Sequence, residues 1–228
     1  MSIIQTSLLN KIYNQTSVPV HALKDVSLEF EPGEFTAIIG TSGCGKTTLL
    51  NLIGGLDSPT SGNVIIEGTN ITGLKPREII DFRLKNIGFV FQAYNLVPVL
   101  TAKENVEFIL QLQGADTNKI EERVKMLFAQ IGLEDRMNDR PSKMSGGQQQ
   151  RVAVARALAS KPKFVLADEP TANLDSKSTN NLLDIMLKLN ETEETTFIFS
   201  THDSRVIKRT RRLITLDDGK VIKDEIIK

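Results

Sequence analysis

The hydrophobic positions of the chain form short apolar runs that are separated by longer segments with helical spacing. We expect strands at residues 22–30, 35–39, 64–67, 87–91, 164–167, 196–199, 212–216 and 221–224. Such runs, alternating with helices, are typical of an α/β protein whose mainly parallel sheet is covered by helices. The sequence DDG at 217–219 predicts a hairpin turn between the last two strands.

The middle of the chain has a different pattern. From about residue 93 to residue 144 no run has the character of a strand, and one helical face is clear. Its apolar positions recur every three to four residues: Ile120, Val124, Leu127, Phe128 and Ile131. We interpret 93–144 as a helical subdomain inserted into a single domain, 1–228, whose α/β core consists of 1–92 and 145–228.

Composition narrows the classes of partner. Lys and Arg together number 28 and Asp and Glu 28, so the net charge is zero and a nucleic-acid partner is not expected. The single cysteine excludes an intramolecular disulfide and is typical of a reducing compartment. Neither a signal peptide nor a long uncharged apolar run is visible. We expect a cytoplasmic protein that is not inserted in a membrane and reaches one only through a partner.

A glycine-rich segment follows the predicted strand at 35–39. It reads GTSGCGKTT and precedes a helical pattern that starts near Lys46. A strand, such a loop and a helix form a phosphate-binding site, because glycines let backbone N–H groups converge on phosphate oxygens. Lys46 adds charge at the β- and γ-phosphates, and the Thr47 hydroxyl can bind Mg²⁺. We expect the nucleotide at Gly40, Thr41, Ser42, Gly43, Cys44, Gly45, Lys46, Thr47 and Thr48.

Polar side chains follow three further strands. FVLADE ends in Asp168, placed to hold Mg²⁺ beside the phosphate loop, and Glu169, placed to orient or deprotonate an attacking water. His202 follows another strand and is expected at the γ-phosphate. Gln92 ends a third strand, where its amide can reach the Mg²⁺ shell. Together with Lys46, the residues Glu169, His202 and Gln92 form the predicted catalytic set.

Two further segments have no clear role by themselves. Tyr13 precedes the core strands and is placed either to stack on an adenine ring or simply to pack. MSGGQQQR at 144–151 combines two glycines with three glutamines. Glycines open a helix poorly by propensity, and adjacent amides do not suit a packed core.

Taken together, these motifs resemble those of the ATP-binding subunits of ABC transporters over nearly the whole chain. GTSGCGKT is similar to Walker A, FVLADE to Walker B, Gln92 to the Q-loop, ANLD to the D-loop, His202 to the switch and Tyr13 to the A-loop. MSGGQ resembles the LSGGQ signature, with Met144 in place of a leucine of similar volume. The resemblance implies the ABC ATPase fold: a P-loop NTPase core with an antiparallel β portion near the N-terminus.

The same resemblance implies a mechanism. Two copies of the chain enclose two ATP molecules, each held between the phosphate loop of one copy and MSGGQ of the other, and water attacks the γ-phosphate with the help of Mg²⁺. The residues implied at the nucleotide from the signature and the D-loop are Ser145, Gly146, Gly147, Gln148 and Asp175. We assign Gln149, Gln150 and Arg151 to the exposed face of the following helix and its contacts with the core.

Longer segments resemble one group within the family. LLNLIGGLDSPTSG and FVFQAYNLVPVLTAKENV are similar to the lipoprotein-releasing, macrolide-export and antimicrobial-peptide-export ATPases. This implies a transport ATPase that powers a separate transmembrane permease from the inner face of the cell membrane. The apolar run at 96–99 is the predicted contact with that permease, with ordinary core packing as the alternative.

Other ATPase and GTPase classes fit less well. A DNA-repair ATPase of this type needs a long coiled coil, for which the segment 93–144 is too short. A translation-associated ATPase usually has two such domains, each with a phosphate loop, whereas this sequence contains one such loop. A GTPase needs an N-K-x-D element, and here Asn118 and Lys119 are followed by Ile120 and Glu121. The ATPase of a non-transport mechanotransmission or cell-division complex with a membrane partner remains an open alternative, because it would keep every motif.

Overall fold

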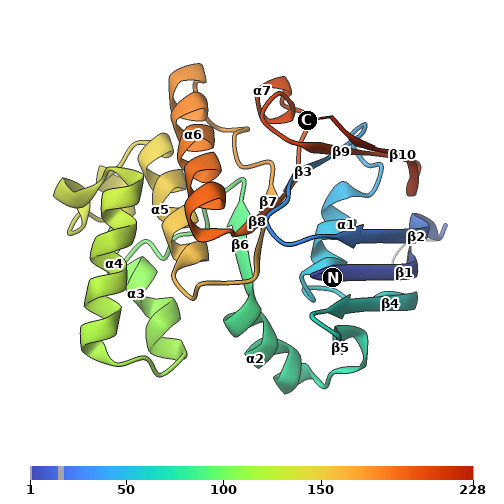
Figure 1. The fold of residues 1–228 in the computed structure, drawn as a ribbon, viewed down its shortest axis with the longest axis horizontal. Coiled ribbons are helices and arrows are strands. Elements are labelled where there is room, and N and C mark those ends of the chain that lie inside the picture. The colour runs from blue at the N-terminus through green and yellow to red at the C-terminus, as the bar shows by residue number, and fades with distance from the viewer. Residues whose placement is uncertain (1, 15–17, 228) are drawn as a thin grey trace.

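Two sheets organise the protein (Figure 1). The computed structural model describes residues 2–14 and 18–227. The smaller sheet is antiparallel with the strand order β2-β1-β4-β5. Its strands are β1 (Ile4–Tyr13), β2 (Val20–Phe30), β4 (Ser61–Ile66) and β5 (Thr69–Asn70). The antiparallel β portion near the N-terminus is therefore confirmed.

The larger sheet is mainly parallel, as the apolar pattern predicts. Its order is β10-β9-β3-β8-β7-β6, and only β10 pairs antiparallel among these described strands. A hairpin joins β9 to β10, and its Asp218 and Gly219 have φ of +42° and +77°. The strands are β3 (Phe35–Ile39), β6 (Ile87–Phe91), β7 (Phe164–Asp168), β8 (Thr196–Ser200), β9 (Arg212–Asp217) and β10 (Lys220–Ile226). The predicted strands differ from these only at their ends.

Strand β1 is not predicted from the hydrophobic pattern, because its pairing register is irregular. Its pairing with β2 shifts between Thr6 and Leu9, and Leu8 has φ +45° with its side chain exposed. An extra residue in a strand reverses the face to which the following side chains point. The buried residues Ile4, Thr6 and Leu9 therefore do not keep a spacing of two, which is the pattern by which a strand is recognised.

Helices cover both faces of the larger sheet (Figure 1). Helix α1 (Lys46–Ile53) packs against one face in a cluster with Ile198. Helices α5 (Gly146–Leu158) and α6 (Ser176–Glu193) pack against the other face in a cluster with Phe197 and Phe199. Successive residues of β8 join different clusters because side chains along a strand point to alternate faces.

The segment 93–144 is helical. It contains α3 (Ala102–Leu112), α4 (Thr117–Ile131) and the short 3₁₀ helices η2 (Glu134–Arg136) and η3 (Pro141–Lys143). The predicted apolar face of α4 is buried in the same cluster as α5 and α6. The remaining helices are η1 (Ile71–Gly73), α2 (Pro76–Asn86) and α7 (Ser204–Ile207). Within residues 2–14 and 18–227, no helix has the length and apolar character needed to cross a bilayer.

The topology places four connections at one edge of the larger sheet. Parallel strands β3, β6, β7 and β8 end at the same side. They lead into the loop 40–45, Gln92, Glu169 and His202 respectively. In open α/β sheets this edge is where ligands bind.

Candidate functional site

The loop between β3 and α1 has a backbone that requires glycine. Gly43 and Gly45 have φ of +80° and +107°, which side chains disfavour. A Cβ at Gly45 would also lie 2.4 Å from the Ala22 carbonyl oxygen. Lys46 begins α1, and its Nζ donates to the carbonyls of Gly40 (2.9 Å) and Thr41 (3.0 Å). The ammonium group is therefore held over the loop.

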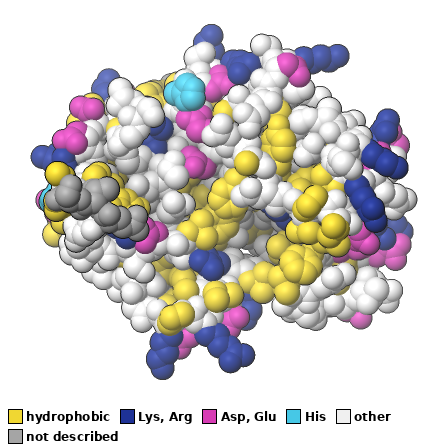
Figure 2. All heavy atoms as spheres, turned by 180° about the vertical axis from the view of Figure 1, so that it is seen from behind, with side chains coloured by type: hydrophobic (Ala, Val, Ile, Leu, Met, Phe, Trp, Pro, Cys, Tyr) yellow, Lys and Arg dark blue, Asp and Glu magenta, His cyan; other side chains and the backbone are white. Residues whose placement is uncertain are grey.

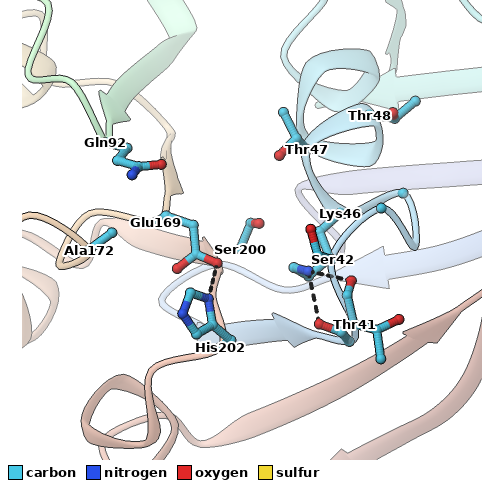
Figure 3. A pocket seen from close by; sticks show the side chains of 13 residues that line it. Thr41, Ser42, Lys46, Thr47, Thr48, Gln92, Glu169, Ala172, Ser200 and His202 are labelled. Atoms are coloured by element: carbon cyan, nitrogen blue, oxygen red, sulfur yellow. Dashed lines mark hydrogen bonds and ion pairs between the residues drawn. The ribbon is translucent and has the colours of Figure 1, made fainter.

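A cavity of 610 Å³ opens above this loop, within the size range of small-molecule sites. Figure 3 shows Lys46 and Thr47 on one side of it and Gln92, Glu169 and His202 on the other. The structure thus brings together the whole predicted catalytic set. The lining residues are Gly40, Thr41, Ser42, Gly43, Gly45, Lys46, Thr47, Thr48, Gln92, Glu169, Ala172, Ser200 and His202.

Cys44 is the one residue of the predicted phosphate loop that does not line the cavity. Its side chain is 4% exposed and joins the cluster beneath α1. A Cβ at Gly40 would lie 2.6 Å from its sulfur. Within the loop, Cys44 therefore packs inward and leaves ligand contact to its neighbours.

The Asp168 and Thr47 side chains bring oxygen atoms together beside the cavity. The Thr47 hydroxyl donates to the Asp168 carboxylate, with Oγ1 at 3.1 Å from Oδ1 and 3.0 Å from Oδ2. Hydroxyl and carboxylate oxygens are the ligands that Mg²⁺ prefers. The donor set therefore fits Mg²⁺, although Asp168 itself is not among the residues that line the cavity.

Glu169 is held in an unusual conformation. Its φ is +45°, and its N–H donates to the Ser200 carbonyl at 2.8 Å. His202 Nδ1 lies 2.7 Å from Glu169 Oε1, and the Thr201 hydroxyl donates to Oε2 at 3.2 Å. A non-glycine residue at positive φ is strained and is found mostly where neighbours fix it, often at functional sites. These contacts aim the carboxylate at the cavity (Figure 3).

Ser200 is a cavity residue that sequence reasoning misses. It ends β8, and its fully buried hydroxyl has no hydrogen-bond partner among the described residues. Ser200 pairs with Asp168 in the neighbouring strand β7, so the two side chains share one face of the sheet. Only that register, which the sequence does not reveal, marks Ser200 as part of the site.

A polar network lies behind His202. Asp203 accepts hydrogen bonds from the Arg205 guanidinium and from the Thr171 hydroxyl, the latter at 2.8 Å. Arg205 Nη1 also donates to Ser176 Oγ at 3.3 Å. Hydrogen bonds from Arg205 lower the pKa of Asp203 to about 2, against the effect of burial. The segment with His202 is thus tied to the start of α6.

Asp175 lies at the amino end of α6, outside the cavity lining. Its carboxylate accepts from the Ser178 N–H (2.9 Å) and hydroxyl (2.8 Å) and caps the helix. The hydrogen bond from the Ser178 backbone, followed by that from its side chain, lowers the pKa of Asp175. In the single chain this D-loop carboxylate therefore has a local structural role.

Tyr13 also lies outside the residues that line the cavity. It ends β1, and its hydroxyl donates to Asp57 Oδ2 at 2.9 Å. Lys11 Nζ lies 4.8 Å from the centre of its ring. Burial and then the hydrogen bond to Asp57 raise the pKa of Tyr13. These contacts fix the ring at the end of β1, an inner strand of the smaller sheet.

The MSGGQ segment starts α5 and does not line the chain's own cavity. Ser145 is the N-cap: its hydroxyl accepts from the Gln148 N–H at 3.3 Å, and its N–H donates to Gln148 Oε1 at 2.8 Å. This reciprocal capping starts the helix despite its two glycines. A Cβ at Gly146 would lie 2.7 Å from the Tyr94 hydroxyl, and one at Gly147 would lie 2.8 Å from Ser178 Oγ. A side chain at either position would therefore displace the Tyr94 or Ser178 side chain.

The three residues after this segment have different environments. Gln149 is half-buried and donates to the Met144 carbonyl at 3.0 Å, and Arg151 donates to the Ile131 carbonyl at 2.8 Å. Gln150 is completely buried. The expectation of an exposed face is therefore wrong for Gln150, because α5 is covered by the sheet on that side and its amide meets backbone carbonyls there.

Known proteins resemble this chain in sequence and in fold. Residues 23–172 match the family described as ABC transporter. An uncharacterized ABC transporter ATP-binding protein of Thermotoga maritima is 46% identical over 211 residues, which are 92% of this chain and 90% of the relative. The macrolide export ATP-binding/permease protein MacB of Hyphomonas neptunium is 44% identical over 97% of this chain but only 34% of its own length.

A solved structure extends the similarity to three dimensions. The ATP-binding cassette MJ0796, a dimer in a post-hydrolysis state bound to ADP and Pi, is 41% identical to this chain. The two match with a TM-score of 0.91 over 99% of each chain. The family match and the similarity of the fold therefore lead to the same assignment. The chain belongs to the ABC transporter family of ATP-binding proteins.

Proposed function

We propose that the chain is the ATP-hydrolysing subunit of a transporter and that two copies close around two ATP molecules. The observation that carries this proposal is that the chain's nucleotide-binding motifs lie in two separate places. The phosphate loop, Gln92, Glu169 and His202 line one cavity, whereas MSGGQ lies elsewhere on the same chain. A second copy supplies MSGGQ to the open side of that cavity. The likeness to the MJ0796 dimer supports this arrangement.

The phosphate loop binds the nucleotide. Backbone N–H groups of 40–45 surround the phosphates, and the ammonium group of Lys46 exchanges its carbonyl partners for phosphate oxygens. Thr47 and Asp168 would hold Mg²⁺ through their oxygen atoms, and Gln92 in the same cavity would add an amide oxygen near it. When bound, Mg²⁺ neutralises negative charge that develops on the phosphate oxygens during transfer. Tyr13 stacks on the adenine ring.

Glu169 and His202 perform the catalytic steps. The Glu169 carboxylate orients the attacking water and accepts its proton. His202 holds this carboxylate through Nδ1, and its other ring nitrogen faces the γ-phosphate. Because Thr201 also donates to Glu169, the base is fixed before the nucleotide arrives, which lowers the entropy that the reaction must lose.

The partner copy completes the site. Its Ser145, Gly146, Gly147 and Gln148 contact the γ-phosphate at the amino end of α5, where the free N–H groups and the helix dipole favour an anion. Its Asp175 links the two sites across the interface. Closing both halves on ATP also excludes water other than the attacking molecule.

Hydrolysis by the purified chain should depend on its own concentration. If the working site needs two chains, phosphate release per chain rises with protein concentration until the dimer is saturated. We expect this rise over a dilution series of about two orders of magnitude at saturating ATP and Mg²⁺. A constant rate per chain, from protein that size-exclusion chromatography shows to be monomeric throughout, would contradict the two-chain site.

An apolar groove lies beside the nucleotide cavity. It encloses 440 Å³ between α2, β6 and α3, and Ile80, Val97 and Phe108 line it with exposed side chains. Figure 2 shows hydrophobic side chains gathered across the middle of one face of the molecule. Val97 belongs to the apolar run at 96–99. Exposed apolar patches of this kind mark interaction sites.

We propose that a helical segment of a separate transmembrane permease occupies this groove and holds the chain at the inner face of the cell membrane. The relative MacB is named as both ATP-binding protein and permease, which supports such a partner. Strand β6 runs from the groove, where Phe89 and Phe91 line it, to Gln92 in the cavity. The likeness to MacB, which is named for macrolide export, favours export of a drug. The longer segments that resemble peptide-export and lipoprotein-releasing ATPases add those two cargoes to the proposal.

Phe108→Glu should detach the chain from its membrane partner. Phe108 is 43% exposed, so the substitution leaves the core intact and places a charge in the groove. We expect about tenfold less tagged chain in washed membranes of its own cells, since losing an aromatic side chain that is a hot spot of an interface weakens binding by about this factor or more. ATP hydrolysis by the purified variant should stay within about twofold of the unmodified chain.

Ile222→Glu is the matched control for this experiment. Ile222 is 62% exposed on β10 and does not line the groove. This variant should remain on the membranes. Equal loss of both variants from the membrane fraction would show a general effect of surface charge and would remove the assignment of the groove.

A further inference from the structure

One buried side chain holds the two backbone segments that carry catalytic residues. Gln150 is fully buried in the second turn of α5. Its Nε2 donates to the Pro170 carbonyl at 2.8 Å and to the Phe91 carbonyl at 3.3 Å. Pro170 directly follows Glu169, and Phe91 directly precedes Gln92. A single amide group thus joins both segments to α5.

The rest of the environment does not call for an amide. Gln150 Oε1 is buried and has no hydrogen-bond partner within the described part of the chain. A buried polar atom without a partner destabilises a fold, so the hydrogen bonds that Nε2 donates to the two backbone carbonyls must offset the cost of burying this amide. The two segments also contact each other directly, since Asn173 Nδ2 donates to the Gln92 carbonyl at 3.1 Å. What Gln150 adds is their connection to α5.

We infer that Gln150 is a positioning residue that fixes Gln92 and Glu169 of its own chain. It does so from the helix whose first residues, Ser145 to Gln148, contact the partner's nucleotide under the proposed function, on which this inference rests. Gln150 therefore serves the site on its own chain, although its sequence neighbours serve the other site. Helix α5 thus contacts the partner's nucleotide with its amino end. Through the Gln150 amide it also contacts the catalytic segments of its own chain.

Gln150→Met tests the inference, because it keeps the volume and removes both hydrogen bonds. We expect kcat to fall about tenfold, since small displacements of catalytic groups have effects of this size or larger. The ATP affinity of the monomer should stay within about twofold. The thermal midpoint should change little, because the hydrogen bonds lost by the Pro170 and Phe91 carbonyls offset the removal of the unpaired Oε1 from the core. Gln150→Leu is the second variant if Met lowers the thermal midpoint.

Gln130→Met is the matched control. Gln130 lies in α4, its Nε2 donates to Glu193 Oε1 at 3.2 Å, and its Oε1 is likewise buried without a partner in the described structure. The substitution is therefore the same and also removes an amide hydrogen bond, here one to a carboxylate and away from the cavity. This variant should hydrolyse ATP at the unmodified rate.

Mixed dimers separate a role in the residue's own site from a role in the partner's site. A catalytically inactive Glu169→Gln chain is added in excess, so that each active chain pairs with an inactive one. The remaining working site then uses Glu169 of the active chain and MSGGQ of the inactive chain. In one arm the active chain carries Gln150→Met, in the other arm the inactive chain carries it, and a reference mixture has neither.

We expect turnover to fall by the same factor, about tenfold, when the active chain carries Gln150→Met, and to change by less than about twofold when the inactive chain carries it. A loss confined to the inactive-chain arm, an equal loss in both arms, or no loss in either would overturn the inference. The reference mixture reports on the proposed function separately. If it shows no ATP hydrolysis while the active chain alone hydrolyses ATP as a monomer, the two-chain site fails instead.

Discussion

Glu169→Gln should accumulate an ATP-bound dimer in which hydrolysis is slowed by about 10³-fold. Glutamine has the shape of glutamate, so contacts with His202 and Thr201 can be kept, but its amide cannot accept a proton from water. The nucleotide then keeps the two copies together. Size-exclusion chromatography with ATP should show a dimer, and phosphate release should measure the loss of turnover.

Glu194→Gln controls for the substitution itself. Glu194 also has a positive φ, +53°, but is exposed at the end of α6. This variant should hydrolyse ATP normally and show no trapped dimer. A Glu169→Gln chain that remains monomeric with ATP and turns over at the normal rate would remove Glu169 from the mechanism and ATP from the interface.

Motifs with a strict spacing made the cavity predictable. The phosphate loop requires a strand before it and a helix after it, and both are present, with β3 at the predicted residues. Parallel topology then places Gln92, Glu169 and His202 at the same edge of the sheet. These predictions depend on local pattern and on the rule that carboxyl ends of parallel strands meet, which is why the sequence was sufficient.

Residues whose role depends on non-local packing were not predictable. Ser200 enters the cavity only through its register with Asp168. Gln150 follows two half-exposed glutamines in sequence and yet is buried, because the direction of α5 against the sheet decides which amide faces inward. The irregular register of β1 hides its alternation. Each of these depends on contacts between segments far apart in sequence, which no local pattern encodes.

Ser145→Arg should leave ATP binding to the monomer intact and reduce hydrolysis to the uncatalysed background. In the proposed dimer the side chain at 145 lies against the partner's γ-phosphate, where a long arginine blocks closure of the two copies. In the single chain Ser145 lies outside the cavity, so the phosphate loop should bind ATP within about twofold of its normal affinity. Isothermal titration with ATP and phosphate release measure the two quantities separately.

Ser145→Arg also removes the N-cap of α5, and this loss could by itself reduce hydrolysis. A matched substitution at the N-cap of another helix separates the two causes. Thr101 caps α3 with the same reciprocal contacts, to Glu104, that Ser145 makes to Gln148. Thr101→Arg should lower stability by about 1 kcal/mol, as expected for a lost N-cap, and keep hydrolysis. If Ser145→Arg instead abolishes ATP binding by the monomer while Thr101→Arg does not, MSGGQ acts on the nucleotide of its own chain. The two-chain site would then be wrong at its central contact.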